Sequence, residues 1–444
     1  MGELERKYYD ALAVIGVQSP KYPAEGDLVA LERAVQRLAI QHPVVNDPEH
    51  RVWDAYAVTA WPTLVFLSPD GLVIGHHAGE AGFDALDHAM IQMVEEYERA
   101  GTLQRGALPY PPAQFSRPSE LLSFPGKVLA TPDRLFIADS GHDRLLVAGL
   151  DGEIERIIGS GEAGLQDGAS NDARFHTPQG MALAGNILYV ADADNHAIRA
   201  VELDSGWVST VAGTGTQARR TVRQGPARST ELSSPWDVVA WGDEIMIAMA
   251  GLHQIWSLNP TDDTVAVWAG TGHEDIQDGP RERAWLAQPM GLSLGNDSLY
   301  IACAETQAIR GIDLHSGEVS TLAGRGLFDF GDEDGCAQSA LLQHPQGLAT
   351  NGDVLRIADT YNNKIKVLRV DSGTVDTLAG SGQAGTLDGP GKNARLFEPG
   401  GISAGDGMIW IADTNNHLIR TIDVASGHVR TLQLHGQGID VRAG

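Results

Sequence analysis

The sequence predicts a two-part fold, a short α/β unit followed by an all-β, six-bladed β-propeller. The propeller is indicated by a proline that opens an apolar strand and recurs six times, at intervals of 53–57 residues. These prolines are Pro125, Pro178, Pro235, Pro289, Pro345 and Pro399. The α/β unit is indicated by the first hundred residues, where short apolar runs alternate with helical patterns. We therefore divide the chain into residues 1–105, a proline-rich linker over 106–120, and a propeller over 121–436.

Four short strands fit between one of these prolines and the next. The second strand ends 14 residues after each proline, as in "LYVAD" and "IWIAD". A third strand follows, as in "AIRAVEL", and a fourth, as in "VSTVAG". Four strands per unit and six units are typical of a six-bladed propeller.

The α/β unit is expected to contain four strands and three helices in the order β-α-β-α-β-β-α. Strands are predicted over 11–19, 42–48, 62–67 and 72–79, and helices over 27–41, 49–58 and 83–100. Asp27 is a suitable N-cap for the first helix, because its carboxylate can accept hydrogen bonds from the first free backbone N–H groups. We expect one mixed sheet covered by these helices.

Charge and cysteine content narrow the functional classes. The chain of 444 residues carries a formal net charge of −26, which disfavours broad binding to nucleic acid. No apolar run reaches the length of a membrane span, and "MGELERKYYD" lacks the layout of a secretion signal. Cys303 and Cys336 are the only cysteines, so a disulfide framework or cysteine-based zinc cluster is excluded. We expect a cytoplasmic protein without a cofactor.

The first unit resembles the thioredoxin-like domains that are fused to NHL propellers. "VIGVQS", "HPVVNDP", "RVWDAYAVTAWPT" and "PDGLVIGHHAGE" carry this resemblance over residues 12–80. It implies that Pro62 is the cis-proline of such folds, and that a strand and a Cys-x-x-Cys helix precede "VIGV". Twelve residues precede Ala13 here and none is cysteine. The resemblance therefore implies a truncated, redox-inactive thioredoxin-like domain.

Trp61, Pro62 and Thr63 have two interpretations. They either shape the local backbone or offer a peptide-binding edge, as the cis-proline strand does in the family. A third possibility is that the natural chain starts upstream and carries the Cys-x-x-Cys motif. The protein would then be a thiol–disulfide oxidoreductase, because exchange needs an attacking thiolate and a resolving partner.

The second unit resembles NHL repeats, most clearly in "VADADNHAIRAVE" (190–202) and "IADTNNHLIRTID" (411–423). The Asp of "AD" recurs in four of six repeats, which indicates a turn-forming residue that accepts backbone N–H groups. His196, His253 and His417 share one repeat position. They could converge on a metal ion, but a role in the repeat is the simpler interpretation, and we predict no metal site.

Long loops join each fourth strand to the next first strand, and they share a Gly-x-Gly … Asp-Gly pattern. Because the pattern repeats, packing explains its shared residues better than a unique ligand does. Specificity is then expected where the copies differ, in the arginine-rich loop 217–228 and the acidic, aromatic loop 326–336. The candidate binding residues in these loops are Arg219, Arg220, Arg223, Arg228, Phe328 and Phe330.

The favoured function is a binding or scaffold protein that uses the loop-rich face of the propeller toward a protein or peptide partner. No catalytic residue is assigned. An enzymatic propeller, such as a metal-dependent lyase or a lactonase, would need carboxylates, Asn or His gathered at one mouth of the channel. His176 and His344 are candidates beside the opening prolines, but Ser234, Gln288 and Glu398 make an uneven set.

Overall fold

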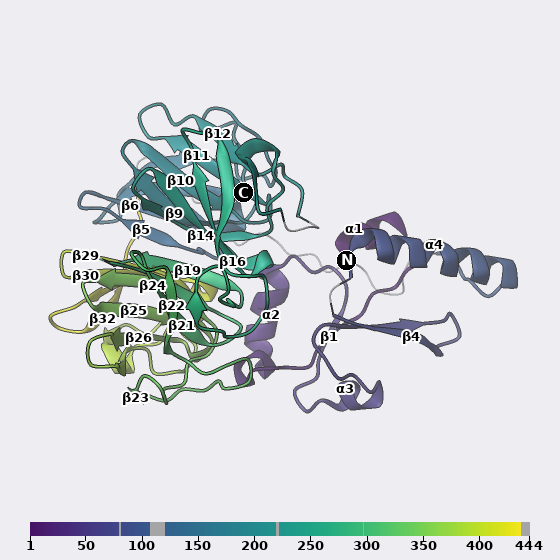
Figure 1. Ribbon diagram of the computed structural model, residues 1–444. Helices are drawn as coiled ribbons and strands as arrows, with labels where there is room; N and C mark the ends of the chain where they lie inside the picture. The colour runs from purple at the N-terminus through teal and green to yellow at the C-terminus, as the bar shows by residue number, and fades with distance from the viewer. Residues whose placement is uncertain (80, 107–119, 219–221, 296, 437–444) are drawn as a thin grey trace. The chain divides into compact units, whose positions relative to one another are not determined.

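The computed structural model describes residues 1–79, 81–106, 120–218, 222–295 and 297–436. The chain divides into two compact units, Met1–Ser116 and Arg117–Gly444, each of which is described by itself (Figure 1). Most of the predicted linker, residues 107–119, lies outside the described residues, as do Arg219 and Arg220.

The first unit contains the predicted succession of strands and helices. Its helices are α1 (Gly2–Lys7), the 3-10 helix η1 (Pro23–Gly26), α2 (Leu28–Arg37), α3 (Arg51–Ala55) and α4 (Phe83–Ala100). Its strands are β1 (Gly16–Gln18), β2 (Val44–Asn46), β3 (Thr63–Leu67) and β4 (Val73–Ala78). Asp27 caps α2 as predicted, because its carboxylate accepts the N–H groups of Val29 and Ala30. The peptide bond between Trp61 and Pro62 is cis.

The prediction of one mixed sheet is wrong for the described residues. β1 pairs with β2 in parallel and β3 pairs with β4 antiparallel, and these are two separate two-stranded sheets. β1 and β2 are only three residues long, and no described strand lies between the two pairs to join them. Apolar side chains near or within the strands, such as Ile15, Val17 and Ile74, are consequently exposed.

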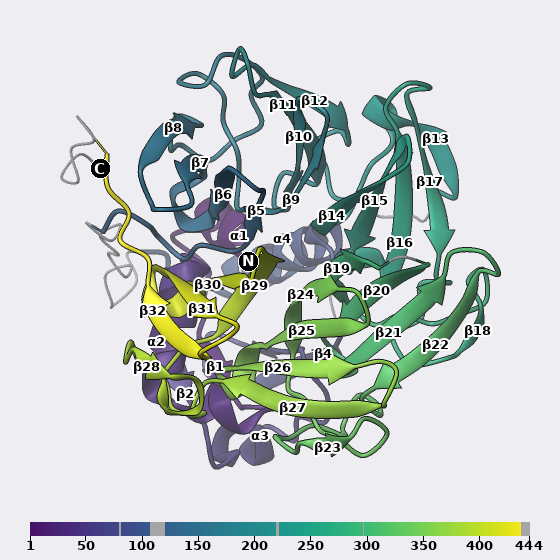
Figure 2. The same ribbon diagram turned by 90° about the vertical axis from the view of Figure 1, so that its left-hand side faces the viewer.

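Six sheets of the described residues form a ring, and we number them as blades 1–6 in chain order (Figure 2). Blade 1 contains β5 (Val128–Ala130), β6 (Arg134–Asp139), β7 (Arg144–Gly149) and β8 (Ile154–Ile158). Blade 2 contains β9 (Pro178–Ala184), β10 (Ile187–Asp192), β11 (Ala197–Glu202) and β12 (Val208–Ala212). Blade 3 contains β14 (Pro235–Trp241), β15 (Glu244–Met249), β16 (Gln254–Asn259) and β17 (Thr264–Ala269), with β13 (Gln224–Pro226) outside them.

The remaining blades repeat this plan, so six four-stranded units are confirmed. Blade 4 contains β18 (Gly279–Pro280), β19 (Pro289–Leu294), β20 (Ser298–Cys303), β21 (Ala308–Asp313) and β22 (Glu318–Ala323). Blade 5 contains β23 (Gly335–Cys336), β24 (Pro345–Asn351), β25 (Val354–Asp359), β26 (Lys364–Arg369) and β27 (Thr374–Ala379). Blade 6 contains β28 (Gly389–Pro390), β29 (Pro399–Gly405), β30 (Met408–Asp413), β31 (Leu418–Asp423) and β32 (His428–Thr431). Short 3-10 turns are η2 (Ser140–His142), η3 (Ala227–Ser229), η4 (Ala250–Leu252), η5 (Thr360–Asn362), η6 (Gly391–Asn393) and η7 (Thr414–Asn416).

Each blade packs an apolar face against the next blade, so the core is a set of layers between blades. The layer between blades 3 and 4, for example, buries Met246, Ile255, Leu286, Leu299 and Ile301. Successive residues of a strand point to opposite faces, so an uninterrupted apolar strand supplies two layers. In β15, for example, Ile245 and Ile247 enter the layer toward blade 2, whereas Met246 and Ala248 enter the layer toward blade 4.

The long loops add an outer strand to the following blade. β13 pairs with β17, β18 with β22, β23 with β27 and β28 with β32, all antiparallel. The ring is sealed by the end of blade 6: the N–H of Ile154 in β8 donates to the carbonyl of His435 at 2.7 Å, and the His435 N–H donates to Gly152 at 3.0 Å. This last seam is parallel, unlike the others.

Candidate functional site

The residues shared by the repeats form a polar network inside each blade, seen most fully in blade 6. The buried guanidinium of Arg420 in β31 lies 2.8 Å from Asp413 of the "AD" pair and 2.6 Å from Asp388 of the Asp-Gly loop. Asp388 also accepts hydrogen bonds from the N–H and hydroxyl of Thr431 in β32. Asp413 accepts the N–H of Phe397 at 2.7 Å. The network therefore fastens the long loop to the blade.

The buried cation and the loop Asp recur in three other blades, and two of these also have the "AD" Asp, since Cys303 takes its place in blade 4. Arg199 joins Asp192 and Asp167 in blade 2, Arg310 binds Asp278 in blade 4, and Lys366 lies near Asp359 and Asp334 in blade 5. Burial raises the pKa of Asp192 and Asp413 to about 6 and that of Asp359 to about 7. The "AD" Asp is present in blades 1, 2, 5 and 6, and in all four it accepts the N–H of the residue two before the opening proline. This shared contact is structural and agrees with the interpretation of the "AD" Asp as a turn residue.

Blade 3 replaces this network with apolar side chains. Met249 stands where blades 1, 2, 5 and 6 have the "AD" Asp, and Trp256 takes the place of the buried Arg; both are fully buried. Gln224 stands at the place of the loop Asp and is exposed. Exchanging a buried ion pair for packed apolar groups of similar volume is compatible with stability. Blade 3 is thus the copy that departs furthest from the repeat.

The three repeat histidines do not converge. The Nδ1 atoms of His196, His253 and His417 accept backbone N–H groups of Ser234, Gln288 and Phe124, respectively, at 2.9–3.1 Å. Asp143, Gln307 and Asn363 do the same at the equivalent places. Each contact joins one blade to the residue before the opening proline of the next. Within the described ranges, no group of three or more His, Cys, Asp or Glu side chains could hold a metal ion.

The centre of the propeller is filled by an ion pair that the sequence reasoning missed. The ammonium of Lys127, just before β5, lies 3.3 Å from Asp237 in β14. It also donates to the carbonyl oxygens of Met290 in β19 at 2.8 Å and Gln346 in β24 at 2.5 Å. Lys127 therefore connects blade 1 with blades 3, 4 and 5. Burial lowers the pKa of Lys127 and raises that of Asp237, and each is the main counter-charge of the other.

The sequence indicates this pair when the six repeats are compared position by position. Lys127 and Asp237 stand two residues after the opening proline, where the other four blades have glycine. These glycines permit neighbouring blades to approach each other closely. A Cβ on Gly180 would lie 2.0 Å from an Asp237 oxygen, and one on Gly401 would lie 2.6 Å from Lys127 Cα. The charged pair and the glycines together close the centre.

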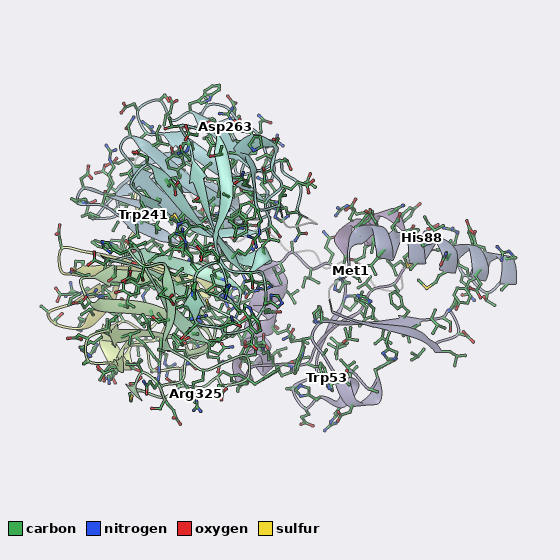
Figure 3. All side chains as sticks on the ribbon, in the orientation of Figure 1. Met1, Trp53, His88, Trp241, Asp263 and Arg325 are labelled. Atoms are coloured by element: carbon green, nitrogen blue, oxygen red, sulfur yellow. The ribbon has the colours of Figure 1, made fainter. Side chains whose placement is uncertain are left out.

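The predicted residues Trp61, Pro62 and Thr63 lie at the turn into β3. Trp61 is 46% exposed and donates its indole N–H to the carbonyl of Ser19 at 2.7 Å. Its ring centroid lies 4.3 Å from that of Trp53, the residue labelled in Figure 3. The Thr63 hydroxyl donates to the Ala60 carbonyl at 2.6 Å. These contacts fit the backbone-shaping interpretation, and a peptide-binding edge stays a prediction.

The two outlier loops lie on different blades. Arg223 and Arg228 are exposed beside β13, on the outer edge of blade 3, and the Nε of Arg228 lies 4.0 Å from Asp263. Phe328, in the loop before β23, is 74% exposed. Phe330 is half-buried in the same loop. Part of this loop's acidity is structural, because Asp332 and Asp334 pair with Lys366 at 2.8 and 3.0 Å.

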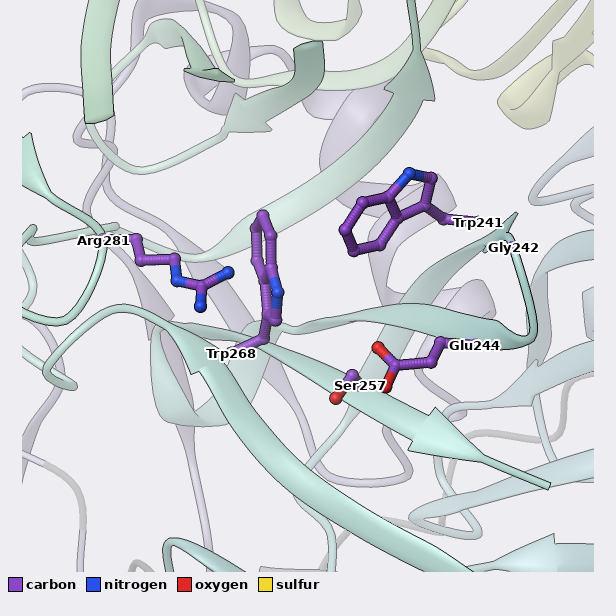
Figure 4. Close-up of a pocket in the computed structure, with 6 residues that line it drawn as sticks. All are labelled: Trp241, Gly242, Glu244, Ser257, Trp268 and Arg281. Atoms are coloured by element: carbon purple, nitrogen blue, oxygen red, sulfur yellow. The ribbon is translucent and has the colours of Figure 1, made fainter. Parts of the chain in front are cut away.

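A further group of residues forms an open pocket at the outer part of blade 3, facing blade 4 (Figure 4). Trp241 ends β14 and Trp268 lies in β17, and their rings meet edge to face with centroids 5.9 Å apart. Both indoles are half-buried against the core between these blades. Glu244 and Ser257 line the same pocket, together with Gly242 and Arg281.

The charges of the pocket are unequally compensated. The guanidinium of Arg281 lies over the Trp268 ring, 4.6 Å from its centroid, and its Nε donates to Glu282 at 3.1 Å. Trp268 stands between Arg281 on one side and Trp241 with Glu244 on the other (Figure 4). Among the described residues, the Glu244 carboxylate has no hydrogen-bond or ion-pair partner.

Trp241, Trp268 and Glu244 are specific to blade 3. At the place of Trp241 the other blades have Thr131, Ala184, Gly295, Asn351 and Gly405. Leu322 and Leu378 are equivalent to Trp268, and Ser298 and Val354 to Glu244. From the sequence, departures from the repeat were expected in the loops, whereas Trp241, Trp268 and Glu244 are in strands. Aligning the strands position by position would have found them.

The described part of the chain has no helix long and apolar enough to cross a membrane. Cys303 is buried at the end of β20, and burial raises the pKa of its thiol to about 11, which keeps it protonated near neutral pH. Cys336, in β23, is exposed.

Comparison with known proteins supports an NHL propeller. The chain is 41% identical to "Protein SUPPRESSOR OF QUENCHING 1, chloroplastic" of Arabidopsis thaliana over 460 residues, which cover 98% of this chain and 43% of that relative. It is 37% identical to "NHL repeat-containing protein 2" of Homo sapiens over 471 residues, which cover 97% of this chain and 65% of that relative. The chain thus spans less than two thirds of the length of these relatives.

No protein-family model matches the chain. Among solved structures, a streptogramin B lyase superposes with a TM-score of 0.43 and 14% identity, covering 70% of this chain and 84% of that one. This likeness carries no argument about activity, and the architecture rests on the strand pairing described above.

Proposed function

We propose that this protein is a non-catalytic binding platform whose propeller recognises a protein partner through the outer surface of blade 3 and the adjoining part of blade 4. The single observation that carries the proposal is the gathering of blade-specific residues there. Trp241, Trp268, Glu244 and Arg281 depart from the repeat and meet in one pocket, and Arg223 lies on the outer edge of the same blade.

The position of Arg223 supports one continuous surface. Its carbonyl accepts the N–H of Val267 at 2.8 Å, so Arg223 is the backbone neighbour of the residue before Trp268. Tryptophan and arginine are the side chains most enriched among energetically dominant contacts of protein interfaces. The shared polar residues, by contrast, are used within the blades, and Lys127 and Asp237 fill the centre.

We further propose that the first unit is a thioredoxin-like module without thiol chemistry in this chain, in a cytoplasmic protein. The order of its elements agrees with the resemblance. Cys303 and Cys336 belong to the propeller, and the first unit contributes no cysteine. We therefore expect that this chain of 444 residues does not accelerate the reduction of a disulfide substrate such as insulin, measured by turbidity with dithiothreitol as the electron source.

Site-specific photo-crosslinking tests the binding surface. A photoreactive amino acid is placed at Asp243, in the turn beside the pocket, and at Asn186, the equivalent exposed turn residue of blade 2. In an extract of the source organism, we expect a discrete crosslinked protein from position 243 and none from position 186. The product should disappear when Trp241 is changed to Asn, the residue of blade 5 at that place.

Equal products from both positions, or a product that survives Trp241→Asn, would show that blade 3 is not the specific surface. The absence of any product from position 243 and from a third probe at Arg223 would overturn the proposal.

A further inference from the structure

We propose that the pocket between Trp241, Trp268 and Glu244 binds the cationic side chain of an arginine or lysine presented by a partner protein. This inference rests on the proposed function and names the chemistry of the partner. It is argued from three features: the unpaired groups of the pocket, the aromatic surfaces beside them, and the charge of the chain.

The polar groups of the pocket have free bonding capacity. Within the described residues, no hydrogen bond or ion pair is made by the Glu244 carboxylate, the Ser257 hydroxyl or the indole N–H groups of Trp241 and Trp268. A carboxylate is an acceptor with two oxygens and can take a guanidinium in a two-point contact. The one cation that lines the pocket, Arg281, donates to Glu282 instead.

The aromatic surfaces also favour a cation. The face of an indole is electron-rich, and a cation within about 6 Å of the ring centroid is attracted to it. The protein already shows this contact on one side of Trp268, where Arg281 lies 4.6 Å from the centroid. The side toward Trp241 and Glu244 lines the open pocket (Figure 4). A second cation can bind there with Glu244 as its counter-ion.

Net charge favours a basic partner over an acidic one. The chain carries a formal charge of −26, which attracts basic segments and repels acidic ones at long range. The pocket supplies the local part of the recognition. Its indoles are held by packing against the core of blades 3 and 4, so little ordering is needed when a side chain binds.

The test uses the full chain labelled with 5-fluorotryptophan and three short peptides with the same Gly/Ser sequence around a central arginine, citrulline or glutamate. Citrulline keeps the shape of arginine and removes its charge. The fluorine resonances of Trp241 and Trp268, assigned through Trp→Phe variants, should shift with the arginine peptide, while exposed Trp207 should not. Glu244→Gln should weaken the binding at least fivefold.

Glu318→Gln is the matched control, because Glu318 is an exposed strand carboxylate outside the pocket. It should change the affinity less than twofold, which separates local recognition from general charge. Both glutamine variants retain the fold if their circular dichroism matches the parent.

Equal binding of the citrulline and arginine peptides, stronger binding of the glutamate peptide, or equal loss in Glu244→Gln and Glu318→Gln would each overturn the inference. The crosslinking experiment is independent of this result. A blade 3 crosslink without arginine binding would contradict the cation site and leave the proposed partner-binding surface in place. Arginine binding without a crosslink would contradict the partner-binding surface and leave only a site that binds a cation.

Discussion

Lys127 shows how a single side chain organises the propeller. Its ammonium contacts three other blades at once, through one carboxylate and two carbonyl oxygens. A buried charge costs several kcal/mol to desolvate and is tolerated only when it is paired and hydrogen-bonded. The ion pair with Asp237 is thus a requirement of the filled centre.

Lys127→Met is therefore expected to lower the free energy of unfolding by about 3–5 kcal/mol, because it leaves Asp237 buried without its counter-charge. The measurement is urea unfolding of the full chain followed by tryptophan fluorescence. Lys392→Met, at an exposed lysine of η6, is the control and should change stability by less than about 0.5 kcal/mol. In Lys127→Met/Asp237→Leu the loss should be smaller than the sum of the two single losses. Additive losses would contradict this account.

At the residue scale, the sequence predicts structural roles better than binding roles. The "AD" aspartates could be assigned to turns because they repeat. Lys127 and Asp237 could not be paired from sequence, since they are 110 residues apart and meet only when the ring closes. The pocket residues pose the same difficulty: Trp241 and Trp268 stand in different strands, and only strand register and the neighbouring blade bring them to Glu244 and Arg281.

The long loop that joins one blade to the next is held to the following blade by side-chain contacts, which explain its shared residues. In blade 6 its Asp388 binds Arg420 and Thr431, while the equivalent Gln224 of blade 3 is exposed. The shared Asp-Gly pattern is thus explained by packing, as the repeat predicts. Blade 3 keeps the outer strand β13 without this anchor, because β13 pairs with β17 through the backbone.

Asp388→Ala should cost about 1–2 kcal/mol of unfolding free energy. Charge-assisted hydrogen bonds contribute about 1.5–3 kcal/mol, and the value is reduced here because the Asp388 side chain is 46% exposed. Gln224→Ala is the matched change and should be close to neutral. Both are measured by chemical unfolding. A similar loss in the two variants would indicate that the backbone pairing alone holds the loop.

Among the elements, those with a long, regular pattern were predicted best. The helix over 83–100 has the predicted bounds, and the six sets of strands follow the repeat. The mixed sheet of the first unit was wrong, because strand pairing depends on which edges meet and not on the apolar runs themselves. Three-residue strands such as β1 carry too little pattern to fix a partner.

The pH dependence of stability is a property of the whole molecule, because some carboxyl groups raise the unfolding free energy as pH rises and others lower it. Hydrogen bonds from Thr431 and the charge of Arg420 hold the pKa of Asp388 below its usual range despite partial burial, so its contribution is lost as pH falls below about 4. Asp359 acts in the opposite sense. Burial raises its pKa from 3.8 to about 7, so the stability that it contributes is complete below pH 3.8 and is lost as pH rises through 7.

Asp359→Asn tests this sign. We expect the unfolding free energy of the parent, relative to the variant, to fall between pH 5 and pH 8, with a slope of at most about 1.4 kcal/mol per pH unit. The measurement is urea unfolding at several pH values. A difference that stays constant or rises with pH would contradict the raised pKa.

The parallel seam between Gly152–Ile154 and His435 has a consequence for the order in which the molecule comes apart. Within the described residues, which end at 436, two backbone hydrogen bonds hold this outermost join and no Asp-Gly anchor reinforces it as Asp388 reinforces the antiparallel one before it. Local opening events should therefore begin there, and amide protons of β8 should exchange with solvent sooner than those of β22 or β27. The first and last blades would peel apart while the opposite side, where the aromatic pocket lies, is still assembled.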